Sequence, residues 1–240
     1  MELLQSVIGQ DRYKYKTAPL YSDKKGYCYE FHGNDDFVLV PDGKLHFLWD
    51  ITKGEPVVLS DTCPYIVNQF IFRQKDLHTY FGIALSYENE ITYDEEEFQR
   101  FTSELLGMKT FFLKCEYCNG RFDNVFFSKS AHPLMISSMN HIIESKGRAA
   151  VETVAISRGY TVRQMERVIW NYYGCSPKMM CRLIRMAYVL MMIEQYPEYS
   201  FATVAENLKF SDAPHLLREF KQFLGMTPKE FSIKYFHRVY

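Results

Sequence analysis

"TVAISRGYTVRQMERVIWNYYGCSP" covers residues 153–177, and "TVAENLKFSDAPHLLREFKQFLGMTP" covers residues 203–228. The two stretches share one layout. Thr-Val-Ala recurs at an offset of 50 residues, and three later pairs recur at an offset of 51, namely Arg167 with Arg218, Gly174 with Gly225 and Pro177 with Pro228. Each copy predicts a short helix, a tight turn, a second helix, and a Gly-x-[Ser/Thr]-Pro entry into a third helix.

A short helix, a tight turn and a second helix form the arrangement that presents a recognition helix to DNA. Ala155 and Ala205 are small enough for close packing of one helix on the next, and Val154 and Val204 are expected to fill the core between them. Residues 177–195 between the copies predict a nineteen-residue helix. Such a helix is about 28 Å long, and successive major-groove segments on one face of a duplex are about 34 Å apart.

The alternative at this point is a duplicated helical bundle without a role in DNA binding, in which the polar residues form a solvated face. Polar side chains at the start of the second helix in each copy favour DNA binding over this alternative. Arginine can bond guanine, glutamine adenine, and glutamate can accept from cytosine. The candidate DNA-binding residues are Thr161, Arg163, Gln164, Glu166, Arg167, Ser211, His215, Arg218 and Lys221.

Composition and charge indicate two different parts. The 240 residues are 47% hydrophobic, enough for a packed core. The net charge of −1 divides into −6 over residues 1–130 and +5 over residues 131–240. A modestly basic second half favours a polyanionic partner.

The front half predicts strands. In residues 45–51, Leu45, Phe47, Trp49 and Ile51 alternate with His46, Leu48 and Asp50, and Pro41-Asp42-Gly43 predicts a turn. The apolar runs at 55–61, 63–72 and 79–87 continue the pattern, which predicts a compact β-rich barrel or sandwich. Its role is either an effector pocket or dimerisation surface, or a scaffold without a ligand. Residues 92–101 then predict a helix capped by Thr92 or Asp94.

The predicted fold is therefore α+β, with a β-rich regulatory domain followed by an all-α domain of two helix-turn-helix subdomains joined by a long helix. The expected boundaries are 1–125 for the regulatory, effector or dimerisation domain, 126–131 for a linker, and 132–240 for the helical domain.

Motifs for catalysis and metal binding are absent from the sequence. It contains no GxSxG, P-loop, GxGxxG or paired catalytic carboxylates, so we expect no catalytic residues, no enzyme activity and no cofactor. His32, His46 and His78 form no HxH pair and have no matching carboxylate, so no metal site is expected there. Cys115 and Cys118 form an unaccompanied CxxC, which is expected to be a buried, reduced pair, with thiol chemistry, redox sensing or metal binding as alternatives.

Targeting signals are also absent. There is no apolar run of membrane-spanning length and no basic-then-apolar N-terminus, so a cytoplasmic protein without membrane association is expected.

The chain resembles the AraC/XylS family of bacterial transcription regulators over roughly residues 134–235. GYTVRQMER (159–167), GCSPKMMCRLIR (174–185) and FSDAPHLLREFKQFLGMTPKEF (210–231) match that family's double helix-turn-helix region in order and spacing. The front half is similar to one kind of N-terminal domain in the family, through FVLVPDGKLHFLW (37–49) and GEPVVLSD (54–61).

This resemblance implies sequence-specific binding of double-stranded DNA by two recognition helices, under an N-terminal domain that responds to a small-molecule effector. RNA polymerase and a second copy of the chain are candidate partners. By position, Arg163, Glu166 and Arg167 of the first helix would face bases. The corresponding residues of the second helix are Ala213, Pro214, Leu217 and Arg218.

Two departures from the family pattern concern the second helix-turn-helix. Lys209 stands where a glycine is common and is expected to adopt positive φ, and Pro214 lies in the first turn of the second recognition helix. The alternative function is a small-molecule or metal sensor that acts through protein contacts. The sequence does not reveal the effector, the operator, the oligomeric state, or whether transcription is raised or lowered.

Overall fold

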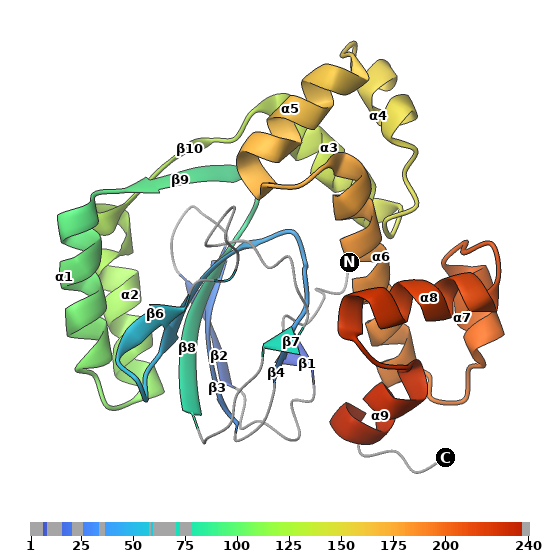
Figure 1. The fold of residues 1–240 in the computed structure, drawn as a ribbon. Helices are drawn as coiled ribbons and strands as arrows, with labels where there is room; N and C mark the ends of the chain where they lie inside the picture. Colours follow the sequence, from blue (N-terminus) through green and yellow to red (C-terminus); the bar gives the residue numbers. More distant parts are fainter. Residues whose placement is uncertain are drawn as a thin grey trace.

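The computed structural model describes residues 7–8, 16–20, 26–33, 37–57, 59, 71–72 and 78–236. Over these residues the chain has the predicted α+β architecture, with antiparallel sheets in the first part and helices in the second (Figure 1). The expected strand at 63–72 lies mostly outside the described residues, which include only β7 (Ile71–Phe72) of that run.

The main sheet is antiparallel, with strand order β2-β3-β8-β5-β6. Its strands are β2 (Lys16–Leu20), β3 (Gly26–Gly33), β5 (Leu45–Asp50), β6 (Glu55–Val57) and β8 (His78–Leu85). β8 lies in the centre and pairs with β3 on one side and β5 on the other.

Two smaller sheets accompany it. β1 (Val7–Ile8), β4 (Phe37–Leu39) and β7 form one, and β9 (Asn89–Tyr93) and β10 (Phe126–Ser130) form the other. β10 occupies most of the segment 126–131 that the sequence marked as a linker. Its five residues pair with β9, and the Ala131 amide donates to the Glu88 carbonyl at 2.9 Å. This segment is therefore a paired strand rather than an open connection.

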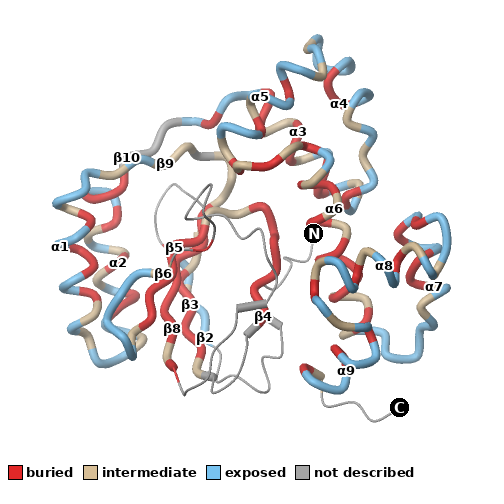
Figure 2. The backbone as a smooth tube through the Cα atoms, viewed as in Figure 1, coloured by how far each residue is buried: buried red, intermediate tan, exposed pale blue. Residues whose placement is uncertain are grey.

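Helices α1 (Glu95–Leu106) and α2 (Phe111–Val125) pack on one face of the main sheet (Figure 1). Asp94 caps α1, as predicted, by accepting from the Glu97 amide. Phe47 and Trp49 of β5 pack against these helices, whereas Leu48 faces a separate aromatic cluster. The alternation along β5 is confirmed, but both faces of the strand are buried (Figure 2).

The face of β5 that carries Leu48 also carries polar residues. His46 Nε2 lies 3.0 Å from Asp42 Oδ1, and the Tyr29 hydroxyl lies 3.1 Å from His46 Nδ1. His78 Nδ1 lies 2.6 Å from Asp50 Oδ2. The expectation that these histidines lack carboxylate partners is wrong, because the sheet brings together residues that are distant in sequence.

Neither histidine belongs to a metal centre in the described residues, where no group of three or more His, Cys, Asp or Glu side chains could hold a metal ion. The described cysteines, including Cys115 and Cys118, are buried free thiols. Cys63 lies outside the described residues.

The helical part follows β10. Its helices are α3 (Pro133–Glu144), α4 (Val151–Ser157), α5 (Val162–Tyr173), α6 (Pro177–Gln195), α7 (Phe201–Asn207), α8 (Ala213–Leu224) and α9 (Pro228–Phe236). α6 has the predicted nineteen residues and runs between the α4–α5 and α7–α8 pairs (Figure 1). None of the helices in the described part of the chain has both the length and the apolar character needed to span a membrane.

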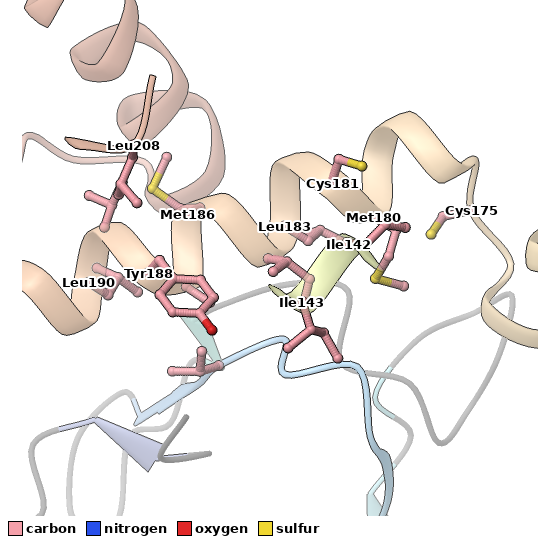
Figure 3. Close-up of a cluster of buried hydrophobic side chains, with 14 of the residues drawn as sticks. Ile142, Ile143, Cys175, Met180, Cys181, Leu183, Met186, Tyr188, Leu190 and Leu208 are labelled. Carbon is pink, nitrogen blue, oxygen red and sulfur yellow. The ribbon is translucent and has the colours of Figure 1, made fainter. Parts of the chain in front are cut away.

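One hydrophobic core joins the helical part to the front half. Val38 and Val40 belong to the same buried cluster as α3 and α6. Figure 3 shows Ile143 of α3 and Tyr188 of α6 pointing toward the segment of the N-terminal part that runs below them. The two parts therefore share an apolar contact.

Candidate nucleic-acid interface

The first helix-turn-helix is built by capping and by small buried residues. Thr161 caps α5 in a reciprocal capping box with Gln164, and Gly174 ends the helix in the left-handed conformation. Val154 and Ala155 of α4 are buried, as predicted. The 12-residue helix is therefore fixed at both ends on its scaffold.

One face of α5 is in the core and the other faces solvent. Met165, Ile169 and Tyr173 are buried, at the spacing of one helical stripe. Arg163, Gln164, Glu166 and Arg167 are exposed. They line a surface hollow of about 480 Å³ together with Thr161, Trp170 and Asn171. The polar face of α5 is thus presented outward and is available to a duplex.

The second helix-turn-helix repeats this plan. Asp212 caps α8 through the His215 amide, and Gly225 ends the helix in the left-handed conformation. Val204 and Ala205 of α7 are buried as their counterparts in α4 are. The helical repeat predicted from sequence is confirmed.

The candidate residues on α8 differ in what they already contact. Ser211 Oγ lies 3.0 Å from His215 Nδ1, so the two bond to each other at the start of the helix. Arg218 and Lys221 are exposed one and two turns further on. A contact of these residues with DNA stays a prediction.

Both departures in the second unit have the expected geometry. Lys209 has φ of 56°, in the left-handed region, and its amide donates to the Glu206 carbonyl at 3.1 Å. Pro214 lies in the first turn of α8, where a missing amide hydrogen removes no helical hydrogen bond.

The connecting helix α6 braces the two units. The Arg182 guanidinium donates to both carboxylate oxygens of Glu219, from Nε at 2.9 Å and from Nη2 at 2.8 Å. Arg185 donates to the Gly147 carbonyl from Nε at 3.1 Å and from Nη2 at 2.7 Å. Burial lowers the pKa of Arg185. Arg182 therefore links α6 to α8, and Arg185 links α6 to the segment before α4.

A groove connects the two recognition helices. It has a volume of about 720 Å³ and is lined by residues of α4, α5, α6 and α8. Glu166 of α5 borders both this groove and the hollow along the α5 face, and His215 of α8 also lines the groove. The exposed starts of the two recognition helices therefore open onto one continuous surface.

Sequence reasoning did not single out three residues of the two helix-turn-helix units. Asp212 caps α8, and an aspartate directly before the helical run could have indicated it. Trp170 and Asn171 extend the exposed face of α5 by one turn. The seven-residue spacing from Arg163 to Trp170 places both on one helical face and could have indicated this exposure.

The comparisons with known proteins agree with this layout. The family model described as "Helix-turn-helix domain" matches residues 154–233. No curated protein sequence matches the chain.

The solved structures that match the chain include ToxT from Vibrio cholerae O395, at 9% identity and a TM-score of 0.46, covering 93% of this chain and 94% of that one. Unsaturated fatty acid bound ToxT from Vibrio cholerae strain SCE256 has 9% identity, a TM-score of 0.47, and 94% coverage of both chains. The C-terminal domain of AraT, a response regulator from Geobacillus stearothermophilus, has 18% identity and a TM-score of 0.41, covering 47% of this chain and 91% of that one.

The repeat of two capped helix-turn-helix units and the match over residues 154–233 agree with the motifs at 159–167, 174–185 and 210–231. The chain therefore contains a helix-turn-helix domain over residues 154–233.

Proposed function

We propose that the chain is a sequence-specific DNA-binding regulator in which α5 reads bases in one major-groove segment and α8 binds the next. The observation that carries this proposal is the continuous surface onto which both helices open, bordered by Glu166 and His215. Arg163, Glu166 and Arg167 would supply base readout, since their side chains are exposed along one face of α5. Arg218 and Lys221 would bind mainly phosphates, because Pro214 and Leu217 beside them carry no hydrogen-bonding group.

The test begins with selection of bound sequences from fragments of genomic DNA by the intact protein. Arg167→Ala is then compared with Arg100→Ala on the selected sequence by fluorescence anisotropy. Arg100 is an exposed helical arginine of α1, paired with Glu97 and far from this surface in sequence, so it serves as a matched control. We expect Arg167→Ala to cost about 1–3 kcal/mol in binding and to relax the preference at one base pair.

Enrichment of no sequence in the selection contradicts the proposal and favours the alternative, a sensor that acts through protein contacts. Equal affinity of Arg167→Ala and Arg100→Ala for the selected DNA contradicts the role given to α5.

We further propose that the N-terminal part regulates DNA binding in response to a small-molecule effector. Support comes from contacts at the C-terminal end of α5. The Tyr173 hydroxyl donates to the Gly43 carbonyl at 3.0 Å, and the Tyr172 hydroxyl donates to Glu90 Oε2 at 3.0 Å. On α3, Asn140 Oδ1 accepts from the Tyr87 hydroxyl at 2.5 Å. An effector that moves the Pro41-Asp42-Gly43 turn would act directly on the first recognition helix.

Tyr173→Phe in the full chain tests this coupling without knowledge of the effector. Loss of the hydroxyl releases the turn while the ring stays in the core. We expect a severalfold change in affinity for the selected DNA, since one hydrogen bond contributes about 0.5–1.5 kcal/mol. Unchanged affinity would show that the turn does not influence the reader.

A further inference from the structure

Two tryptophans of the chain have opposite surroundings. Trp49 is 0% exposed and donates to the Thr102 hydroxyl, whereas Trp170 is 57% exposed. A tryptophan side chain offers about 150–250 Å² for burial. Trp170 therefore leaves a large apolar surface in water, in the last turn of α5.

Trp170 shares its face with the residues proposed to read DNA. Arg163, Arg167 and Trp170 follow at spacings of four and three residues, which place them along one side of the helix. All three line the same hollow. The next residues, Tyr172 and Tyr173, turn to the other side and bond to the N-terminal part. The side of α5 that carries Trp170 is thus the side that faces away from the rest of the protein.

The second recognition helix, α8, also exposes apolar side chains next to charged ones. At the offset of 51 residues, Leu217 stands where α5 has Glu166, and Leu217 is 38% exposed. Each recognition helix therefore presents a large apolar side chain beside an arginine, at a different position along its length. This difference in position would let the two readers prefer different base sequences.

We infer that Trp170 is a specificity-determining residue that contacts a thymine methyl group at the far end of the segment read by α5. This inference rests on the proposed DNA-binding function. Among the groups that the major groove presents, the C5 methyl of thymine is the apolar one, and aromatic side chains can pack on it. Seven residues of helix advance about 10 Å, which is three base pairs at about 3.4 Å each. Trp170 thus reads a thymine about three base pairs beyond the position of Arg163.

The experiment uses the sequence selected by the intact protein, with each thymine replaced in turn by deoxyuridine. This replacement removes only the methyl group and keeps base pairing. Affinities are measured for the wild type, Trp170→Ala, Trp170→Phe and Ile156→Ala. Ile156 is 71% exposed on α4 and does not line the hollow, so it controls for the loss of an exposed apolar side chain.

We expect one thymine whose replacement by deoxyuridine lowers the affinity of the wild type about fourfold, which is the effect of losing one buried methyl-sized group. Trp170→Ala should lose this sensitivity, Trp170→Phe should keep most of it, and Ile156→Ala should match the wild type. In parallel, binding of the selected DNA should reduce the quenching of wild-type tryptophan fluorescence by acrylamide, a neutral quencher. Trp49 is already buried, so this change reports on Trp170.

The inference is overturned if Trp170→Ala keeps the methyl sensitivity, or if it weakens binding equally on all sequences, as a contact with phosphate or sugar would. It is also overturned if DNA leaves Trp170 open to the quencher, as a protein-docking role would. Enrichment of no sequence in the selection would instead refute the proposed function, and an unaffected Arg167→Ala would refute the role given to α5, so these failures can be told apart.

Discussion

The hydroxyl of Tyr173 donates to the carbonyl oxygen of Gly43 at 3.0 Å, across 130 residues of sequence. Tyr173 is the last residue of α5, and Gly43 lies in the Pro41-Asp42-Gly43 turn of the N-terminal part. The turn is buried against Met139, Ile143 and Ile184. This turn of the N-terminal part is thereby attached to the C-terminal end of α5.

Replacement of Gly43 by alanine should loosen this attachment. Gly43 has φ of 81°, and an added Cβ would lie 2.8 Å from Met139 Cε. Gly54 has φ of 75° with no described atom within 4 Å of such a Cβ, so Gly54→Ala has the backbone strain without the clash. We expect Gly54→Ala to lower the free energy of unfolding by about 1–2 kcal/mol, and Gly43→Ala by about 1–3 kcal/mol more.

Urea denaturation measures both variants, and limited proteolysis reports whether the two parts separate. Equal losses for Gly43→Ala and Gly54→Ala would mean that the turn is not held against α3 and α6.

Asp42 in this turn predicts an acid-sensitive contribution to stability. Burial by itself would raise the pKa of Asp42, but Lys44 and His46 lower it well below the 3.8 of a free aspartate. A lowered pKa in the folded state stabilises the protein above the unfolded pKa, near pH 4, and this contribution is lost as the pH falls below that value.

We expect Asp42→Asn to lower the free energy of unfolding at pH 7 by about 1–3 kcal/mol and to flatten its decline between pH 5 and pH 3. Asp94→Asn is the matched control, because asparagine also caps helices and Asp94 is exposed. Urea denaturation at each pH measures the free energy of unfolding. If this free energy falls equally with pH in the wild type and in Asp42→Asn, the assignment is contradicted.

Lys209 predicts a stabilising substitution. Its φ of 56° is strained for a residue with a Cβ, and glycine adopts this conformation without strain. We expect Lys209→Gly to raise the free energy of unfolding by about 0.5–1 kcal/mol, which is about 2–4 °C in Tm at 1 kcal/mol. Lys209→Ala removes the charge but keeps the Cβ, and should not stabilise. Equal thermal shifts for the two variants would assign the effect to charge instead of backbone strain.

The pair of Arg182 and Glu219 predicts a link between stability and operator spacing. Lysine cannot reproduce the two parallel hydrogen bonds of Arg182. We expect Arg182→Lys to lower the free energy of unfolding by about 1–2 kcal/mol and to reduce discrimination against DNA with one base pair added between the two half-sites.

Arg100→Lys is the control for that substitution, because its pairing with Glu97 is on the surface and contributes at most about 0.5 kcal/mol. Unfolding is followed in urea and spacing preference by anisotropy. A variant Arg182→Lys that keeps the wild-type spacing preference would show that other contacts fix the distance between the readers.

Much of the helical part could be predicted from local sequence. Caps such as Thr161 and Ser176, the glycines after α5 and α8, and the repeat at 50 and 51 residues are short-range signals, and each has the expected conformation. The exposed polar face of α5 follows from the same helical period.

Long-range contacts could not be predicted in this way. These contacts depend on how elements distant in sequence pack together. Examples are the hydrogen bond between Tyr173 and Gly43, the pairing of β10 with β9, and the ion pair between Arg182 and Glu219. Periodicity assigns a residue to a face but does not name its partner. The exposure of Trp170, in contrast, could have been predicted from the helical period of α5.

The most direct test of the proposed reading by two helices is a hydroxyl-radical footprint of the intact protein on its selected DNA, repeated with Arg167→Ala and Arg218→Ala. We expect two protected patches on the same face of the duplex, with centres about 10 base pairs apart. Arg167→Ala should weaken one patch first and Arg218→Ala the other. A single patch, or two patches on opposite faces of the duplex, would contradict simultaneous binding by α5 and α8.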